Sequence, residues 1–437
     1  MTDARSKGMA VPSSRIGRLT RLGSMTAGIA GNMALGGAAQ LGRGQRPTWR
    51  GLLLTPSNVT RIADQLAKMR GAAMKIGQLI SMDTGDVLPP ELAQIMARLR
   101  DDAYFMPPAQ LKKVLAAQWP ANWLRAFARF NVHPIAAASI GQVHRAVLRD
   151  GRDMAVKVQY PGVVRSIDSD VANVGTLIRM SGLLPKGISL DPYLEEAARQ
   201  LHEETDYALE AQHLTRFATL LKDAEGFVLP QVYPDWTTPA VLSMQFIEGA
   251  PIETAADASQ EERDLIMARL VDLTLRELFQ FRLMQTDPNF ANYRYLASTG
   301  DIVLLDFGAT RKIGAEISQH YRTLLKSGLN GDRKAVEEAA EDLGFLDDSV
   351  SPDHKERVLR LIMFAFDALR EPKFDFADTS LSRRMQQEGE ALAHDGFVPP
   401  IVPIDVLYLQ RKIAGMFLLG ARLRAKLPVA EILFRHL

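Results

Sequence analysis

The residues that could do chemistry gather in one stretch of the sequence, between Asp287 and Asp306. Asp287 lies five positions before Asn292, and Asp306 follows an apolar run and opens an Asp-Phe-Gly triplet. A carboxylate on a loop can orient or deprotonate a nucleophile, while amide and carboxylate oxygens are the ligands that Mg²⁺ prefers. The pattern predicts magnesium-assisted phosphoryl transfer, with Asp287 as the base and with Asn292 and Asp306 as metal ligands.

A lysine upstream supplies the next part of such a site. Residues 134–141 form a loop of small residues, and two strand-like segments follow at 142–148 and 154–158, joined by a turn. Lys157 lies on the second strand, and this order is typical of a kinase nucleotide lid. Taken alone, a lysine of this kind would be assigned to an edge strand. The candidate contacts to the nucleotide in this loop are Ala136, Ala137, Ala138 and Ser139.

Two helical segments lie on either side of this hairpin. Residues 56–82 carry apolar side chains at three- and four-residue spacing, with Lys75 and Gln78 off that stripe, which alone indicates a solvated polar face. Residues 190–222 form a long acidic helix or a helix pair. In a continuous helix Glu204 and Glu210 would point about 120° apart, so that each could serve a different lysine.

The second half of the chain is expected to be mainly helical. A strand at 241–246 is followed by a turn at Glu248-Gly249-Ala250-Pro251, where a hinge between two lobes would lie, so Gln245 and Ile247 are candidate nucleotide contacts. Near the end, Arg411 and Lys412 stand among apolar residues at helical spacing. This segment is either a packed helix or a second membrane-facing surface, and packing is the preferred interpretation.

Composition narrows the classes of function. The 437 residues are 47% hydrophobic with a net charge of +1, so a nucleic-acid partner is not indicated. The chain has no cysteine, which excludes disulfides and thiolate metal sites. Residues 1–50 carry eight Lys or Arg and one Asp, a basic, Gly/Ala-rich arm that suits an anionic membrane surface. A disordered tail is the alternative, and an Arg-rich start also resembles an organellar transit peptide.

The complete set of motifs resembles a known family. From about residue 125 to 330 the chain resembles a protein kinase, and over most of its length beyond residue 55 it resembles the UbiB (AarF) family of atypical kinases, in its mitochondrial-type coenzyme Q branch. The segments that carry the resemblance are Lys75-Ile76-Gly77-Gln78, Leu88-Pro89-Pro90-Glu91, residues 136–144, Glu204-Thr205-Asp206-Tyr207, Gln285-Thr286-Asp287-Pro288-Asn289 and residues 410–415.

The resemblance implies a role for each part. Lys157 would contact the phosphates of ATP or ADP and pair with Glu210, while Asp287 would occupy the position of the catalytic base and Asn292 and Asp306 would hold Mg²⁺. The helix of the Lys-x-Gly-Gln motif would cover the place where a protein substrate docks, and the Glu-x-Asp motif would meet it. These two regulatory motifs contribute Lys75, Gln78, Glu204 and Asp206.

Departures from ordinary kinases argue against protein phosphorylation in trans. The small loop has alanines where a kinase lid has glycines, and a Cβ restricts close approach of the backbone to phosphates. Gln285-Thr286 replaces His-Arg before Asp287, and no Ala-Pro-Glu follows Asp306. ATP hydrolysis, or phosphorylation of a small or lipid-like acceptor, is therefore expected.

The predicted fold is a bilobal, protein-kinase-like α+β domain with an N-terminal helical extension. The expected parts are a membrane-facing arm (1–50), an extension (51–108), an N-lobe with inserted helices (109–246) and a helical C-lobe (247–437). The predicted function is Mg-nucleotide binding and ATPase or kinase activity in support of ubiquinone biosynthesis, and the alternative is a non-catalytic nucleotide-binding scaffold. Expected partners are anionic lipids and ubiquinone precursors or their enzymes, on the cytoplasmic face of the inner membrane or its organellar equivalent, and a homodimer is left open.

Overall fold

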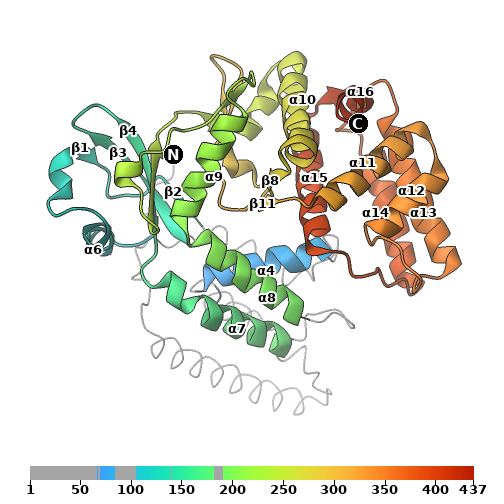
Figure 1. Cartoon of the computed structure of the whole chain (residues 1–437), viewed down its shortest axis with the longest axis horizontal. Coiled ribbons are helices and arrows are strands. Elements are labelled where there is room, and N and C mark those ends of the chain that lie inside the picture. The colour runs from blue at the N-terminus through green and yellow to red at the C-terminus, as the bar shows by residue number, and fades with distance from the viewer. Residues whose placement is uncertain (1–65, 67–68, 84–104, 139, 182–189) are drawn as a thin grey trace, which may run out of the picture. The chain divides into compact units, whose positions relative to one another are not determined.

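The computed structural model describes residues 66, 69–83, 105–138, 140–181 and 190–437 (Figure 1). The chain divides into two compact units. The first comprises residues 1–212 and 231–246, and the second comprises residues 213–230 and 247–437. No helix among the described residues is both long enough and apolar enough to cross a membrane.

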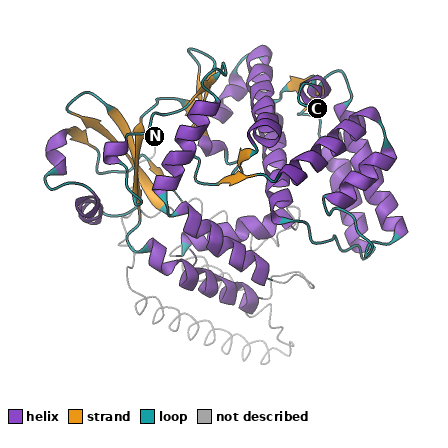
Figure 2. Ribbon diagram, in the orientation of Figure 1, coloured by secondary structure: helices purple, strands orange, loops and turns teal. Residues whose placement is uncertain are grey.

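The first unit is built on an antiparallel sheet (Figure 2). Its strands run in the order β1-β3-β4-β6, and β2 pairs with β3 as well. The hairpin turn between β3 and β4 contains Gly151, whose φ of 93° favours glycine. The strands are β1 (Phe127–Phe130), β2 (Ala136–Ala137), β3 (Gly141–Leu148), β4 (Asp153–Gln159) and β6 (Val241–Gln245).

One correction concerns the small-residue loop. Ala136 and Ala137 were expected in a loop, but they form strand β2, with Ala136 opposite Val143. The backbone N–H of Ala138 donates to the carbonyl of Gly141 at 2.8 Å, which closes a tight turn onto β3. Two alanines give no alternating pattern from which a strand could be predicted. The strand exists because these residues pair with β3.

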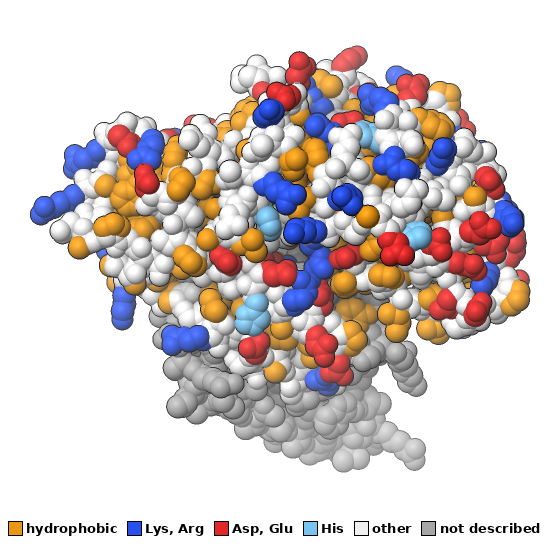
Figure 3. All heavy atoms as spheres, in the orientation of Figure 1, with side chains coloured by type: hydrophobic (Ala, Val, Ile, Leu, Met, Phe, Trp, Pro, Cys, Tyr) orange, Lys and Arg blue, Asp and Glu red, His pale blue; other side chains and the backbone are white. Residues whose placement is uncertain are grey.

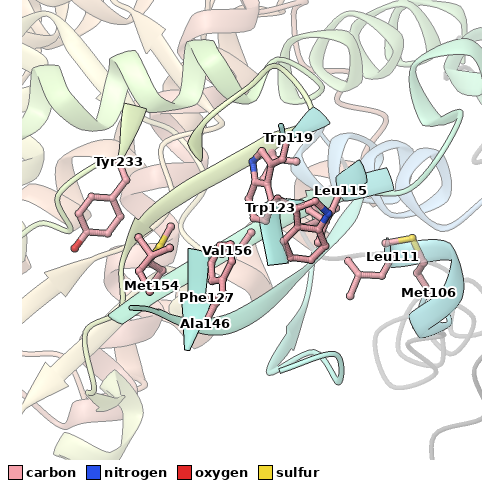
Figure 4. Packing of buried hydrophobic residues seen from close by; sticks show 13 residues of the cluster. Met106, Leu111, Leu115, Trp119, Trp123, Phe127, Ala146, Met154, Val156 and Tyr233 are labelled. Carbon is pink, nitrogen blue, oxygen red and sulfur yellow. The ribbon is translucent and has the colours of Figure 1, made fainter. Parts of the chain in front are cut away.

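An aromatic cluster forms the core of the first unit (Figure 4). The centroid of the Trp119 ring lies 5.1 Å from that of Trp123, 5.5 Å from Phe127 and 5.0 Å from Trp236. Offset and edge-to-face pairs of this kind stabilise beyond the area they bury. The cluster packs helix α6 (Pro108–Gln118) and the short helix η1 (Trp123–Ala126) against the sheet.

Three helices of the first unit pack against one another, namely α4 (Arg70–Asp83), α7 (Val163–Ser181) and α8 (Asp191–Glu204) (Figure 1). Helix α9 (Tyr207–Leu220) follows α8 after a break at residues 205–206 and continues into the second unit. The acidic segment is therefore a helix pair, and the angle of about 120° expected for a continuous helix does not apply.

The second unit is mainly helical, and its described residues form three small sheets, β5-β10-β9-β7, β8-β11 and β12-β13. Acidic side chains gather over α12, α13 and α14 of this unit in the face drawn in Figure 3.

The strands of the second unit are β5 (Phe227–Val228), β7 (Ala250–Pro251), β8 (Leu283–Gln285), β9 (Tyr293–Leu296), β10 (Asp301–Leu304) and β11 (Thr310–Lys312), with β12 (Phe374–Asp375) paired to β13 (Lys426–Leu427). Its helices are α10 (Gln260–Arg276), α11 (Ala315–Asn330), α12 (Arg333–Asp342), α13 (Pro352–Leu369), α14 (Ser380–His394), α15 (Ile404–Leu423) and α16 (Val429–Phe434).

Candidate active site

Lys157 is held at the centre of the sheet of the first unit. It lies opposite Val143 of β3 and Leu242 of β6, so its backbone is fixed from both sides. Its Nζ donates to both carboxylate oxygens of Glu210 on α9, each at 2.9 Å. The predicted Lys157–Glu210 contact is therefore present. Glu210 is buried and the Lys157 side chain is only 11% exposed, so the pair holds the ammonium group in one position.

A second residue on β4 sets the position of α9. The side-chain amide of Gln159 donates to the carbonyl of Thr205 at 2.5 Å and to that of Pro239 at 3.0 Å. Gln159 thereby ties the turn before α9 to the sheet, two residues beyond Lys157. Sequence reasoning did not identify Gln159, although a polar residue on a buried strand is the signal that could have found it.

The start of α9 leaves no room for a side chain at residue 141. A Cβ built on Gly141 would meet the carbonyl oxygen of Val158 at 2.5 Å and the hydroxyl of Tyr207 at 2.7 Å. The ring of Tyr207 in turn lies 5.0 Å from the Nζ of Lys157. Glycine at this position allows α9 to approach β4 closely enough for Glu210 to reach Lys157.

The Lys-x-Gly-Gln motif lies on α4. Lys75 is buried and forms an ion pair with Glu204 at the end of α8. The solvated face expected from the helical pattern alone is wrong for Lys75, because α7 and α8 pack on α4. Gln78 also lies on α4, but its side chain is outside the described part of the structure.

Asp206 was expected to meet the Lys-x-Gly-Gln helix together with Glu204, and here the structure corrects the prediction. Asp206 is exposed, and its Oδ1 accepts from the backbone N–H groups of Ala208 and Leu209 at 3.0 and 3.1 Å. It is the N-terminal cap of α9. Its short side chain satisfies donors at the start of that helix. Among the described residues, the carboxylate that pairs with Lys75 is Glu204.

The remaining nucleotide candidates of the lid and hinge occupy different settings. Ala136, Ala137 and Ala138 line the β2 turn, and Ser139 falls outside the described residues. Gln245 ends β6 with its side chain exposed, and its backbone N–H donates to Gln231 at 2.8 Å. Ile247 opens the next segment of the second unit and is half-buried. Nucleotide contact by these residues stays a prediction.

The second unit brings Asp287 and Asn292 together. The amide nitrogen of Asn292 donates to Oδ2 of Asp287 at 3.0 Å, and Nη2 of Arg411 donates to Oδ1 at 2.9 Å. The Asp287 side chain keeps 25% of its surface exposed. Two donors on its two oxygens fix the direction of this carboxylate, which is what a positioned base requires.

The Asp-Phe-Gly segment is tied to the same loop. The N–H of Leu305 donates to the carbonyl of Asn292 at 3.0 Å, which sets the strand before Asp306 beside the loop. Oδ1 of Asp306 accepts from Gly308 N–H at 2.9 Å. The buried ring of Phe307 lies 4.6 Å from that of Phe217 on α9, within the second unit.

The donor set fits magnesium. Since the amide nitrogen of Asn292 is turned toward Asp287, its amide oxygen and the carboxylate of Asp306 are the hard oxygen donors that could hold the ion. Mg²⁺ keeps several waters and takes phosphate oxygens when it binds, so two protein ligands suffice.

Helix α15 supplies residues that sequence reasoning did not assign to the site. Next to Arg411, the Nζ of Lys412 donates to Oε1 of Gln285 at 3.2 Å and to the hydroxyl of Tyr293 at 3.0 Å. Gln285 precedes the catalytic loop and Tyr293 follows it, so one ammonium group ties both ends of the loop. The preferred interpretation of this segment, a packed helix, holds for Arg411 and Lys412.

The Lys412 ammonium has a buried counterion, Glu277, whose Oε2 lies 3.6 Å from Nζ. Burial raises the pKa of Glu277 to about 7, against the lowering effect of Lys412. Burial lowers the pKa of Lys412, but the charge of Glu277 and the contact with Tyr293 outweigh it and raise the value to about 12. Helix α15 also lies against the loop at Gly415, where a Cβ would be 2.2 Å from that of Pro288.

Comparisons with known proteins decide the family. Residues 98–340 match the family model of the ABC1 atypical kinase-like domain. The chain is 41% identical over 429 residues to "Atypical kinase COQ8, mitochondrial" of Saccharomyces cerevisiae, which covers 98% of this chain and 85% of that protein. The chain belongs to the ABC1 atypical kinase-like family.

Other ABC1 relatives agree. "Atypical kinase COQ8B, mitochondrial" of Rattus norvegicus is 38% identical over 439 residues, covering 98% of this chain and 81% of that protein. Among solved structures, Rv3197 of Mycobacterium tuberculosis in complex with erythromycin matches with a TM-score of 0.60 and 26% identity, over 84% of this chain and 92% of that one. The predicted UbiB (AarF) resemblance is confirmed.

As an ABC1 protein, the chain has a kinase-like α+β fold and is a kinase-like phosphotransferase or ATPase, as predicted. The ABC1 family implies nucleotide binding. The arrangement within each unit suits that chemistry, with an oriented lysine in the first and a fixed carboxylate beside magnesium-type ligands in the second. The roles of the individual residues stay predictions.

Proposed function

We propose that this ABC1 protein binds Mg-nucleotide and hydrolyses ATP, or transfers its phosphoryl group to a small or lipid-like acceptor, in support of ubiquinone biosynthesis at a membrane surface. Support comes from the COQ8 relatives, which align over nearly the whole chain and are named as mitochondrial atypical kinases. The mitochondrial relatives support an organellar location. Peripheral attachment to the inner membrane is part of the proposal. The acceptors or partners would be ubiquinone precursors or the enzymes that handle them.

In the proposed reaction each residue has one task. Lys157, steadied by Glu210, would contact the nucleotide phosphates. Asn292 and Asp306 would hold Mg²⁺, which when bound neutralises charge on the phosphate oxygens. Asp287 would accept a proton from the attacking water or hydroxyl, or orient it. The contact between Lys75 and Glu204 would keep the extension closed over the place where a protein substrate would dock.

The observation that carries this proposal is the setting of Asp287. Binding a nucleotide requires Lys157 and Asp306, but it has no need for a second carboxylate held by two donors. The hydrogen bonds from Asn292 and Arg411 restrict Asp287 to one orientation while part of its surface stays exposed. Such an arrangement favours catalysis over the alternative, a nucleotide-binding scaffold without turnover.

Two substitutions separate the alternatives. Asp306→Asn should abolish the thermal shift produced by Mg-ATP, because an amide cannot replace the charge that faces a divalent cation. Asp287→Asn should keep that shift and slow ATP turnover on the order of a hundredfold. Turnover at the wild-type rate in Asp287→Asn would favour the scaffold. An undiminished shift in Asp306→Asn would remove that residue from the metal site.

A further inference from the structure

The first unit carries a run of positive charge without acidic residues. Residues 105–149 contain six Lys or Arg and no Asp or Glu. Arg145 in this run is bonded to Asp153 on β4. The other five are exposed, and none forms an ion pair with an Asp or Glu within the part of the chain that the structure describes. These five residues, which we call the basic tip, are Lys112, Lys113, Arg125, Arg129 and Arg149.

Four of the five cations in the basic tip form two pairs of neighbours. Lys112 on α6 and Arg129 on β1 line the same cavity, so both cations border it. Arg149 donates to the backbone carbonyl of Arg125 at 2.8 Å, which places these two side by side. Leu124, the neighbour of Arg125 in the chain, lines the same cavity, so the two pairs of cations border one region of the first unit.

The cavity beneath the basic tip is apolar. It has a volume of about 300 Å³, and Leu111, Leu115 and Trp123 are among the residues that line it. Figure 4 shows these three residues in the buried cluster. Leu124, whose side chain is 48% exposed, lines it as well. An apolar hollow bordered by cations fits a ligand with an apolar end and an anionic group.

We propose that the basic tip binds an anionic phospholipid at a bilayer surface, with Lys112 and Arg129 on the phosphate and the end of an acyl chain in the cavity. The volume is at the lower end of ligand sites, so it suits part of a chain while the rest stays in the bilayer. Surfaces that bind single-stranded nucleic acid instead combine cations with exposed stacking rings, and here Trp123 and Phe127 are buried.

This inference deepens the membrane part of the proposed function, because it adds a lipid contact on the first unit to the arm at residues 1–50, which lies outside the described residues. It involves none of the residues assigned to nucleotide or magnesium. Lipid binding can therefore fail while ATP turnover persists, and the reverse also holds, so the two ideas are tested separately.

The test uses the full chain and vesicles of phosphatidylcholine with or without phosphatidylglycerol. The variant Lys112→Gln/Lys113→Gln/Arg129→Gln removes three charges from the basic tip. Each charge near an anionic surface strengthens binding about fivefold, so the apparent affinity should fall about a hundredfold. A control variant removes three exposed lysines of the second unit and should bind like wild type. Its substitutions are Lys326→Gln, Lys334→Gln and Lys373→Gln.

Equal losses in the two triple variants would mean that only net charge matters, and would overturn the proposal. Binding of a polyglutamate peptide together with no binding of anionic vesicles would assign the surface to an acidic protein and overturn it too. ATP turnover measured without vesicles should be the same in wild type and in the basic-tip variant.

Tryptophan fluorescence locates the contact. The chain has four tryptophans, and Trp119, Trp123 and Trp236 all lie in the aromatic cluster of the first unit. In a Trp49→Phe background, vesicles with brominated acyl chains should quench this cluster, and the basic-tip variant should abolish the quenching. Vesicle binding without quenching would place the lipid elsewhere and refute the assignment.

Discussion

Lys412→Met should weaken both the folded state and the catalytic loop. Methionine keeps the length and most of the volume of the lysine stem, so the substitution removes the charge without leaving a large cavity. It also leaves Glu277 buried without its counterion, because the Lys412 and Glu277 side chains are only 3% and 2% exposed. Gln285 and Tyr293 lose the donor that ties the two ends of the loop.

The expected size of the effect follows from burial. Removing one partner of a buried ion pair costs about 3–5 kcal/mol of folding free energy, because the other group must either stay charged in a desolvated site or take up a proton. A matched control is Lys426→Met, whose partner is Asp375 and whose side chain is 48% exposed. A pair as exposed as this contributes about 0–1 kcal/mol. Adding Glu277→Gln to Lys412→Met should recover part of the loss, since the unpaired charge disappears.

Urea unfolding of wild type, Lys412→Met, Lys426→Met and the double variant measures these differences in folding free energy. ATP turnover of the folded variants reports whether the catalytic loop is intact. Turnover should fall in Lys412→Met and remain at the wild-type level in Lys426→Met. If Lys412→Met were no more destabilising than Lys426→Met, the buried cluster would contribute nothing to stability and the reasoning would be refuted. If Glu277→Gln deepened the loss, Glu277 would have a role besides that of counterion.

The pH dependence gives an independent check. Because burial raises the pKa of Glu277 from 4.5 to about 7, its contribution to stability is present below about 4.5 and is lost as the pH rises through about 7. Without Lys412 that pKa rises further, so the variant goes on losing stability above pH 7, by at most about 1.4 kcal/mol per pH unit. The deficit of Lys412→Met relative to wild type should therefore grow between about pH 6 and about pH 8. A constant deficit would contradict the assigned protonation.

Three further predictions concern the first unit. In a double-mutant cycle on Lys75→Ala and Glu204→Ala, the second substitution should add little proteolytic sensitivity or self-phosphorylation to the first, and additive effects would exclude the pairing as the common cause. Gly141→Ala should destabilise by about 1–3 kcal/mol in thermal or urea unfolding, because its Cβ meets the β4 backbone. The open helical control Gly389→Ala should be neutral or stabilising, and a neutral Gly141→Ala would show that α9 can shift freely. Ala137→Gly should change the ratio of ATP to ADP affinity, because glycine gives the lid backbone more conformational freedom. An unchanged ratio would show that Ala137 serves only in packing.

Local patterns predicted most of what lies close together in the sequence. The strands around Lys157 begin and end within one residue of the predicted bounds, because alternation and the Asp-Gly turn define a hairpin. Asp287 and Asn292 are five residues apart, so the loop that contains both also brings them together. The Asp206 cap was also predictable, since Asp before a helix is a common N-cap.

Contacts between distant segments were not predictable in the same way. Lys412 meets Gln285 across 127 positions, and nothing near residue 412 indicates which segment of the chain α15 will cover. Gln159 likewise meets Thr205 only because the break between α8 and α9 lies beside the sheet. The pair of Lys157 and Glu210 was foreseen from the family resemblance, since spacing alone left several acidic residues as equal candidates.

The hydrogen bond from Arg411 to Asp287 has a consequence for the synthesis of the protein. Arg411 follows Asp287 by 124 positions, so the carboxylate emerges long before its arginine has been made. At ribosomal rates of about 5–20 residues per second, the delay is about 6–25 seconds. During that time the hairpin that carries Lys157 is already complete, whereas the loop that would do chemistry is not. A chain released before residue 411 would therefore carry the lysine for a nucleotide, but its Asp287 would lack the hydrogen bond from Arg411. Early termination at any of these 124 positions therefore has the effect of an active-site mutation.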